Sequence, residues 1–227
     1  MPAEAQLGRA RYPVHFFGQM TSEIHNDDSR TATCWHEAGH SVVCRLLGAP
    51  IKRVYGWPPR VIGGQYVAGI VLREALDFRG KGLKENLEFE MMIALSGPIA
   101  ERVPCPRTYT NNVFNGVHEG DNEVFWSAAY YYCAMFGQKP AKRETNPEMK
   151  TALEEIGRKK IVEDTTAVWR ASPSLIPPAV LELRAEITRK TERLLYENWL
   201  AIERVASALL ARGELSQDQV DEAIAKN

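Results

Sequence analysis

Residues 28 to 47 combine a helical pattern of apolar side chains with two histidines placed four positions apart. The apolar residues recur at helical spacing and form one stripe, made of Trp35, Val42, Val43, Leu46 and Leu47. His36 and His40 flank this stripe, so on a helix they lie one turn apart on the same face and are half-buried. Gly48 predicts the end of the helix. A chain with this segment is expected to bury the helix in its core, with two imidazoles beside the buried stripe.

The spacing of the histidines suits a single zinc ion. Both imidazoles can reach one metal, and Glu37, directly after the first histidine, can serve as general base on a water molecule held there. Three fixed residues also occur in ordinary amphipathic helices. However, a half-buried polar group without a partner is costly, and Gly39 in mid-helix costs about 1 kcal/mol relative to alanine. Close packing of something against the helix would explain Gly39, and together these features favour metal binding.

The composition is that of a soluble globular protein, with 44% hydrophobic and 25% charged residues. A length of 227 residues suits one large domain, or one domain with an appendage. The net charge of −1 gives no indication of nucleic-acid binding. No apolar run approaches the ~20 residues of a membrane span. The four cysteines form no Cys-x-x-Cys pair, which favours reduced thiols in a cytoplasmic protein.

The sequence pattern divides the chain into four segments. Residues 1–27 are expected to form a loose N-terminal arm, and residues 28–137 are expected to form the core of the domain with the histidine helix. Residues 138–177 are polar and charged, and we interpret them as an insertion or linker. Residues 178–227 are expected to form a C-terminal helical part of the same domain. The sum is an α+β fold, mainly α-helical, with one small β-sheet.

Within the core, residue types predict two strands and a second helix. A short strand is expected over residues 51–55, and a second one, rich in β-branched residues, over residues 66–72. A helix is expected over residues 83–103, kinked or divided at Gly97-Pro98. Residues 104–120 are rich in Pro, Asn and Gly and predict a loop.

The remaining helices are predicted from their end signals. An aromatic-rich helix is expected from about residue 121 to residue 136. A long helix is expected to begin at Pro177-Pro178, because proline is tolerated in the first turn. Two more follow: one over about 199–212, ended by Gly213, and a short one that begins with the capping-box pair Ser216 and Gln219.

Catalytic zinc usually has three protein ligands and one open position. Three residues could supply the third ligand: Glu101 on the second helix, His118 in the predicted loop, and Asp121 at the start of the aromatic helix. Each also has an ordinary interpretation, as a solvated helix residue, a loop residue and an N-cap, respectively. The residue pattern alone does not rank them.

Four blocks of the sequence carry a resemblance. They are Ala32–Val43 around the histidines, Ala94–Arg102, Gly120–Val124, and the closing helices from Thr191 to Ser216. In this order they resemble the M41 peptidase family, the proteolytic domain of FtsH-type membrane-bound AAA proteases. The resemblance covers most of residues 30–137 and 178–225. Pro98 and Ile99 depart from the family's Arg-Ala, residues 116–119 replace its Thr-Thr-Gly-Ala, and residues 138–177 have no clear counterpart.

This resemblance implies a zincin-like helix and a metalloendopeptidase that hydrolyses peptide bonds with Zn2+. It implies that His36, His40 and Asp121 are the zinc ligands and that Glu37 is the catalytic base. Glu101 would orient one histidine through its other ring nitrogen. His118 stays an alternative ligand, because the family's sequence before the aspartate is not kept.

The family also implies a way of binding substrate. There the substrate runs extended beside an edge strand near the metal, and the matching residues here are Tyr66, Val67, Ala68, Gly69 and Ile70. Main-chain pairing with this strand would suit an unfolded protein or a peptide. An ordinary covered sheet edge is the alternative interpretation of the same strand.

FtsH-type proteases carry an ATPase module in the same chain, whereas this sequence has no Gly-x-x-x-x-Gly-Lys-[Ser/Thr] loop. We therefore expect cleavage that is independent of ATP, or substrate delivery by a separate ATPase or adaptor. A homo-oligomer is a further candidate, because rings are typical of the family.

Two other classes of function stay open. The first is a zinc-binding regulatory or interaction module without proteolytic activity, against which the presence of Glu37 argues. The second is a small-molecule amidase, which a narrow closed cleft would indicate.

Overall fold

A computed structural model gives the fold, and it describes residues 29–57, 60–62, 65–67, 70–73, 82–114, 118–136 and 176–225. The expected N-terminal arm lies outside these ranges, and so does the expected linker except for its last two residues. The division of the chain into four segments therefore stays a prediction.

The described elements are, in chain order, α2 (Ser29–Leu46), β1 (Ile51–Tyr55), β2 (Arg60–Ile62), β3 (Gln65–Val67), β4 (Ile70–Arg73), α3 (Leu83–Arg102), α4 (Pro106–Phe114), α5 (Glu119–Phe136), α8 (Pro178–Glu197), α9 (Trp199–Arg212), β5 (Glu214–Ser216) and α10 (Gln217–Ala225). Helices dominate, and the strands form two small sheets, so the expectation of a single small sheet was wrong. The predicted class, α+β and mainly α-helical with a C-terminal helical segment, is confirmed.

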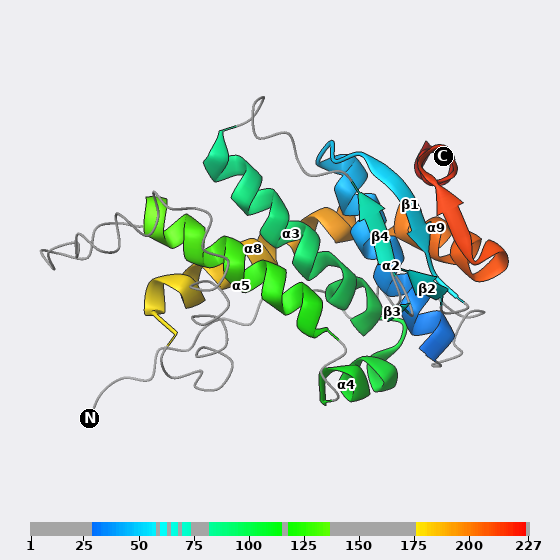
Figure 1. The fold of residues 1–227 in the computed structure, drawn as a ribbon, viewed down its shortest axis with the longest axis horizontal. Coiled ribbons are helices and arrows are strands. Elements are labelled where there is room, and N and C mark those ends of the chain that lie inside the picture. Colours follow the sequence, from blue (N-terminus) through cyan, green and yellow to red (C-terminus); the bar gives the residue numbers. More distant parts are fainter. Residues whose placement is uncertain are drawn as a thin grey trace, which may run out of the picture.

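Helix α2 lies at the centre of the described fold, between α3 on one side and β1 and α9 on the other (Figure 1). Most of its residues are buried, including Trp35, Val42 and Val43 from the apolar stripe. The helix ends where expected: Gly48 adopts a left-handed φ of 78°, and the Ala49 amide donates to the Cys44 carbonyl. The prediction of a buried helix is confirmed for Ser29–Leu46.

Helix α3 is continuous through Pro98. Of the two outcomes expected at Gly97-Pro98, a kink or a division of the helix, the division is therefore excluded. Proline has no N–H for the carbonyl of Ala94, which costs one helical hydrogen bond. Packing outweighs this loss, because Gly97 and Ala100 on either side of the proline are packed against α2. Beyond α2, helix α3 also lies alongside α5, with α8 packed against both (Figure 1).

The approach of α2 to α3 requires a glycine at position 39. A Cβ atom on Gly39 would lie 2.6 Å from the Cβ atom of Ala100 and 2.6 Å from the carbonyl oxygen of Ser96. Both atoms belong to the backbone of α3 or are attached directly to it, so they cannot move without moving the helix. This confirms the interpretation that something packs closely against the histidine helix at Gly39.

The three-stranded sheet has the order β4-β1-β5, with both neighbours antiparallel to β1. The central Val54 pairs with Val71 of β4 and with Leu215 of β5. Strand β5 was not expected from the sequence. It joins the C-terminal part of the chain to a strand about 160 residues earlier.

The single strand expected over residues 66–72 was wrong in extent. Residues 65–67 belong to β3, which pairs with β2, whereas residues 70–73 belong to β4, which pairs with β1. Residues 68 and 69 lie outside the described residues. A run of β-branched residues favours extended backbone, but it does not specify which strand each part pairs with.

The loop expected over residues 104–120 was also wrong, because α4 lies within it. Pro106 is well suited to the first helical position, and the Tyr109 amide donates to the Cys105 carbonyl at 2.9 Å. Cys105 and Thr108 are buried, so tertiary packing outweighs the weak helix propensity of the threonine and asparagine residues. Helix α5 begins two residues earlier than expected, at Glu119.

The C-terminal helices match their predicted end signals. Pro178 opens α8, and Gly213 ends α9 with a φ of 77° and an amide that donates to the Leu209 carbonyl. The capping box before α10 is formed: the Ser216 amide donates to Gln219 Oε1 at 2.9 Å, and the Gln219 amide donates to Ser216 Oγ at 3.4 Å.

Two side-chain contacts attach α2 to these C-terminal helices. The rings of Trp35 and Trp199 stack with centroids 5.4 Å apart, which joins α2 to α9. Arg45 donates from Nε and Nη2 to the two carboxylate oxygens of Asp221, at 2.6 Å and 3.0 Å, which joins α2 to α10.

All four cysteines are free thiols, as expected, and Cys34, Cys44 and Cys105 are buried. Within the described residues, no helix is long and apolar enough to cross a membrane.

We expect Gly39→Ala to lower the free energy of unfolding by about 1–3 kcal/mol, because the added methyl group overpacks the contact with α3. Urea denaturation followed by circular dichroism measures this change. Gly120→Ala is the matched control, since its Cβ atom would meet nothing within 4 Å and the change should be neutral or stabilise by up to about 1 kcal/mol. A Gly39→Ala protein as stable as the wild type would contradict the close packing.

Candidate metal centre

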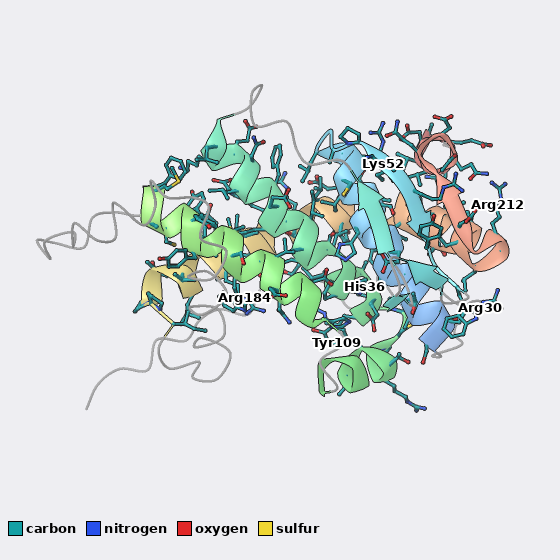
Figure 2. All side chains as sticks on the ribbon, viewed as in Figure 1. Arg30, His36, Lys52, Tyr109, Arg184 and Arg212 are labelled. Carbon is teal, nitrogen blue, oxygen red and sulfur yellow. The ribbon has the colours of Figure 1, made fainter. Side chains whose placement is uncertain are left out.

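Helix α2 presents His36 and His40 on one face, as their spacing predicts. Their ring centroids are 4.7 Å apart, and the two Nε2 atoms lie 3.0 Å apart. His40 is buried, whereas His36 is partly exposed. Figure 2 shows His36 in the middle of the molecule, with Tyr109 of α4 just below it. Glu37, between the two histidines in sequence, is buried with 6% of its surface exposed.

Asp121 reaches both histidines from the first turn of α5. Its Oδ2 lies 3.0 Å from His36 Nε2, and its Oδ1 lies 3.3 Å from His40 Nε2. The two Nε2 atoms and the Asp121 carboxylate therefore face one point. The distances between these ligand atoms are 3.0 to 3.3 Å. Tetrahedral zinc with bonds of about 2.0–2.1 Å holds its ligand atoms about 3.3 Å apart. His36, His40 and Asp121 thus fit a metal ion in both donor type and spacing.

The opposite ring nitrogens of the two histidines are held by α3. His40 Nδ1 donates to the carbonyl oxygen of Ile93 at 2.8 Å, with Ser96 Oγ 3.3 Å away. His36 Nδ1 donates to Glu101 Oε2 at 3.1 Å. With both Nδ1 atoms occupied in this way, the two Nε2 atoms face Asp121, which is the orientation that a metal site requires.

Glu101 and His118 form a second group around the other edge of His36. His118 Nε2 donates to the same Glu101 Oε2 atom at 2.9 Å, and the His118 ring stacks on the His36 ring with centroids 5.1 Å apart. These three residues are also close enough to hold a metal. Their donor atoms are already bonded to one another, however, on the side of His36 that faces away from His40 and Asp121.

The charges of the group are coupled. Burial acts to lower the pKa of His36, but hydrogen bonds with Asp121 and Glu101 outweigh it and raise this pKa to about 10. Burial acts to raise the pKa of Glu101, and hydrogen bonds from His118 and His36 outweigh it and lower this pKa to about 2. A metal ion binds neutral imidazole, so its uptake must displace the proton from His36.

The pKa values of the other two carboxyl groups, Asp121 and Glu37, are shifted in opposite directions. Burial opposes ionisation of Asp121, but the neighbouring charge of His40 and a hydrogen bond from His36 hold its pKa well below the ordinary range. Burial raises the pKa of Glu37, although His36 and His40 counteract it. A carboxyl group with a raised pKa is the better proton acceptor near neutral pH, whereas a strongly ionised one suits metal ligation.

Gly97 allows α3 to pass directly beside the two histidines. A Cβ atom at this position would lie 2.7 Å from His36 Nε2 and closer still to His40 Nε2. From the sequence, Gly97 was expected only to kink or divide the helix, and the roles of the Ile93 carbonyl and Ser96 were not predicted. The available signal for a close approach was a glycine within a strongly apolar helix, shortly before the candidate ligand Glu101.

The residues of the expected substrate strand fall into different elements. Tyr66 and Val67 belong to β3 and Ile70 belongs to β4, while Ala68 and Gly69 lie outside the described residues. Strand β4 has β1 as its neighbour and forms an edge of the three-stranded sheet within the described part of the chain. The role of this segment in substrate binding stays a prediction.

A comparison with known proteins supports a relationship to FtsH proteins. No family model matches the chain. The ATP-dependent zinc metalloprotease FtsH 2 of Methylacidiphilum infernorum (isolate V4) is 24% identical to it over 223 residues, which is 97% of this chain and 33% of the relative. The chain therefore resembles a region of an FtsH protein over almost its whole length and spans about a third of that relative.

We expect Gly97→Ala to weaken zinc binding by roughly 100-fold, because the methyl group occupies the space of the two Nε2 atoms. The imidazole rings can rotate away, so the helical circular dichroism should change little. Competition with a chromophoric chelator measures the zinc affinity. Gly120→Ala, one residue before Asp121, adds the same methyl group in open space and should keep zinc. Equal zinc affinity in the two variants would contradict the placement of Gly97.

Proposed function

We propose that this protein is a zinc-dependent metallopeptidase that hydrolyses peptide bonds, with His36, His40 and Asp121 as zinc ligands. One observation carries the proposal: two Nε2 atoms and a carboxylate converge within 3.0 to 3.3 Å beside the buried Glu37. The similarity to an FtsH metalloprotease supports it from the sequence. These donors leave a fourth tetrahedral position for water or substrate, as catalytic zinc sites require.

Zinc bound to these residues would polarise the scissile carbonyl and activate a water molecule for attack. Glu37 takes a proton from the attacking water and then delivers it to the nitrogen of the leaving amine. Its raised pKa brings its affinity for a proton closer to that needed near neutral pH. The ionised Asp121 cannot do the same work while both of its oxygens face the histidines.

Glu101 supports this site by binding the ring nitrogen of His36 that does not face the proposed metal. It is 1% exposed, and its Oε2 atom accepts from His36 Nδ1, which fixes the ring tautomer that leaves Nε2 available. The Ile93 carbonyl does the same for His40. Both supports come from α3, so the two imidazoles are held in one orientation by a single helix.

We propose an unfolded protein or a peptide as substrate, lying extended along the edge of β4. An edge strand offers main-chain hydrogen bonds to any extended chain, which would make binding tolerant of sequence. The same proposal includes a separate ATPase or adaptor that delivers the substrate. It also includes assembly of the protein into a homo-oligomer.

We expect Glu37→Gln to keep stoichiometric zinc and to reduce casein cleavage by about 100- to 10,000-fold, because it removes the proton acceptor without removing a ligand. Metal analysis and release of labelled peptides measure the two effects. Glu182→Gln removes an exposed carboxylate on α8 and should leave both unchanged. If Glu37→Gln cleaved casein as fast as the wild type, the mechanism would be wrong. A wild-type protein that binds zinc but cleaves no unfolded substrate would favour a regulatory zinc-binding module.

Asp121→Ala should lose zinc, because the carboxylate that faces both Nε2 atoms is removed. Equilibrium dialysis against zinc, followed by metal analysis, measures the stoichiometry. The matched control is Asp218→Ala, which removes another first-turn aspartate, in α10, far from the histidines in sequence. Zinc retained at one equivalent in Asp121→Ala would point to Glu101 or His118 as the third ligand.

A further inference from the structure

His118 is a buried histidine that the proposed mechanism does not use. It is 5% exposed, it lies just before α5, and its carbonyl oxygen accepts a hydrogen bond from the Asn122 amide at 3.0 Å. Its Nε2 donates to Glu101 Oε2 at 2.9 Å. One residue therefore contacts the carboxylate behind His36 and also forms the start of the helix that carries Asp121.

His118 lies on the Nδ1 side of His36, with the Glu101 carboxylate between the two histidines, whereas the metal position lies on the Nε2 side. Glu101 Oε2 accepts from His36 Nδ1 on one side and from His118 Nε2 on the other. The metal position lies at the opposite edge of His36, where Nε2 faces Asp121. To act as a ligand through Nε2, His118 would have to break its bond to Glu101, and Glu101 would then lose one of the bonds that hold it.

We propose that His118 is a positioning residue, whose side chain fixes the Glu101 carboxylate against His36 from the start of the helix that carries Asp121. The inference rests on the proposed zinc site of His36, His40 and Asp121. The stacking of the His118 ring on the His36 ring, with planes 18° apart, holds the two imidazoles parallel while their nitrogens share one carboxylate oxygen. A hydrogen bond and a stacking contact from the same side chain restrict both the carboxylate and the ring that it orients.

The first test compares zinc affinity in two variants, measured by chelator competition. His118→Phe keeps an aromatic ring but loses the donor, and we expect zinc to bind about 10- to 100-fold more weakly. His118→Gln places an amide N–H near the former Nε2 and should stay within about threefold of the wild type. A wild-type affinity in His118→Phe would overturn the inference. Complete loss of zinc in His118→Gln would overturn it in favour of direct ligation.

The second test separates positioning from simple packing through a double-mutant cycle. Glu101→Gln alone should weaken zinc by about 10- to 100-fold, and adding His118→Phe should weaken it by less than about threefold more. If His118→Phe had the same effect with and without Glu101, the side chain would act by packing, and the inference would be wrong. If His118→Phe fails to fold, His118→Asn replaces it, because its shorter amide cannot reach Glu101.

Tyr109→Leu provides the control for ring contacts. The Tyr109 ring lies 5.6 Å from the His118 ring, tilted by 31°, and makes no described bond to Glu101. Zinc affinity within about threefold of the wild type is expected, and a loss as large as that of His118→Phe would overturn the inference. Casein cleavage is recorded in parallel: zinc binding without cleavage refutes the peptidase proposal alone, whereas a wild type without zinc affinity overturns both.

Discussion

The rest of the structure depends on the close contact between α2 and α3. Gly39 of α2 lies against Ser96 and Ala100, and Gly97 of α3 lies against the two histidines, so each helix contributes one glycine to the same interface. At each of these points one helix has no side chain of its own, so the other helix can lie directly against its backbone. As a result, the Ile93 carbonyl and the Glu101 carboxylate of α3 can reach the ring nitrogens of α2 directly.

Charge balance follows from the same contact. Two carboxylates from different helices, Glu101 and Asp121, bond to opposite nitrogens of His36. A carboxylate that is removed from water is stable only when it is paired, and the buried Glu101 and the half-buried Asp121 both find their partner in a histidine side chain. Glu37 is the exception, since its burial is not offset in the same way and its pKa rises. One buried cluster therefore contains carboxyl groups with opposite tendencies, one set suited to ligation or support and one suited to proton transfer.

The sequence predicts local features well and their partners poorly. The helix of His36 and the ends marked by Gly48, Gly213 and the Ser216 capping box follow from local rules, and they were predicted correctly. Strand β5 and helix α4 have weak local propensity and form through packing, so the pattern missed them. The residues also left Glu101, His118 and Asp121 unranked, because ranking them requires knowing which nitrogen of His36 each one faces.

The pairing of β1 with β5 has a consequence for the newly made chain. Residues 51–55 leave the ribosome long before residues 214–216, yet β1 acquires its second neighbour only from that late segment. Trp199 and Asp221 also hold α2 from the C-terminal side. Until residues 199–221 have been synthesised, the histidine helix therefore lacks its contacts with both of these residues, and β1 has only β4 as a neighbour.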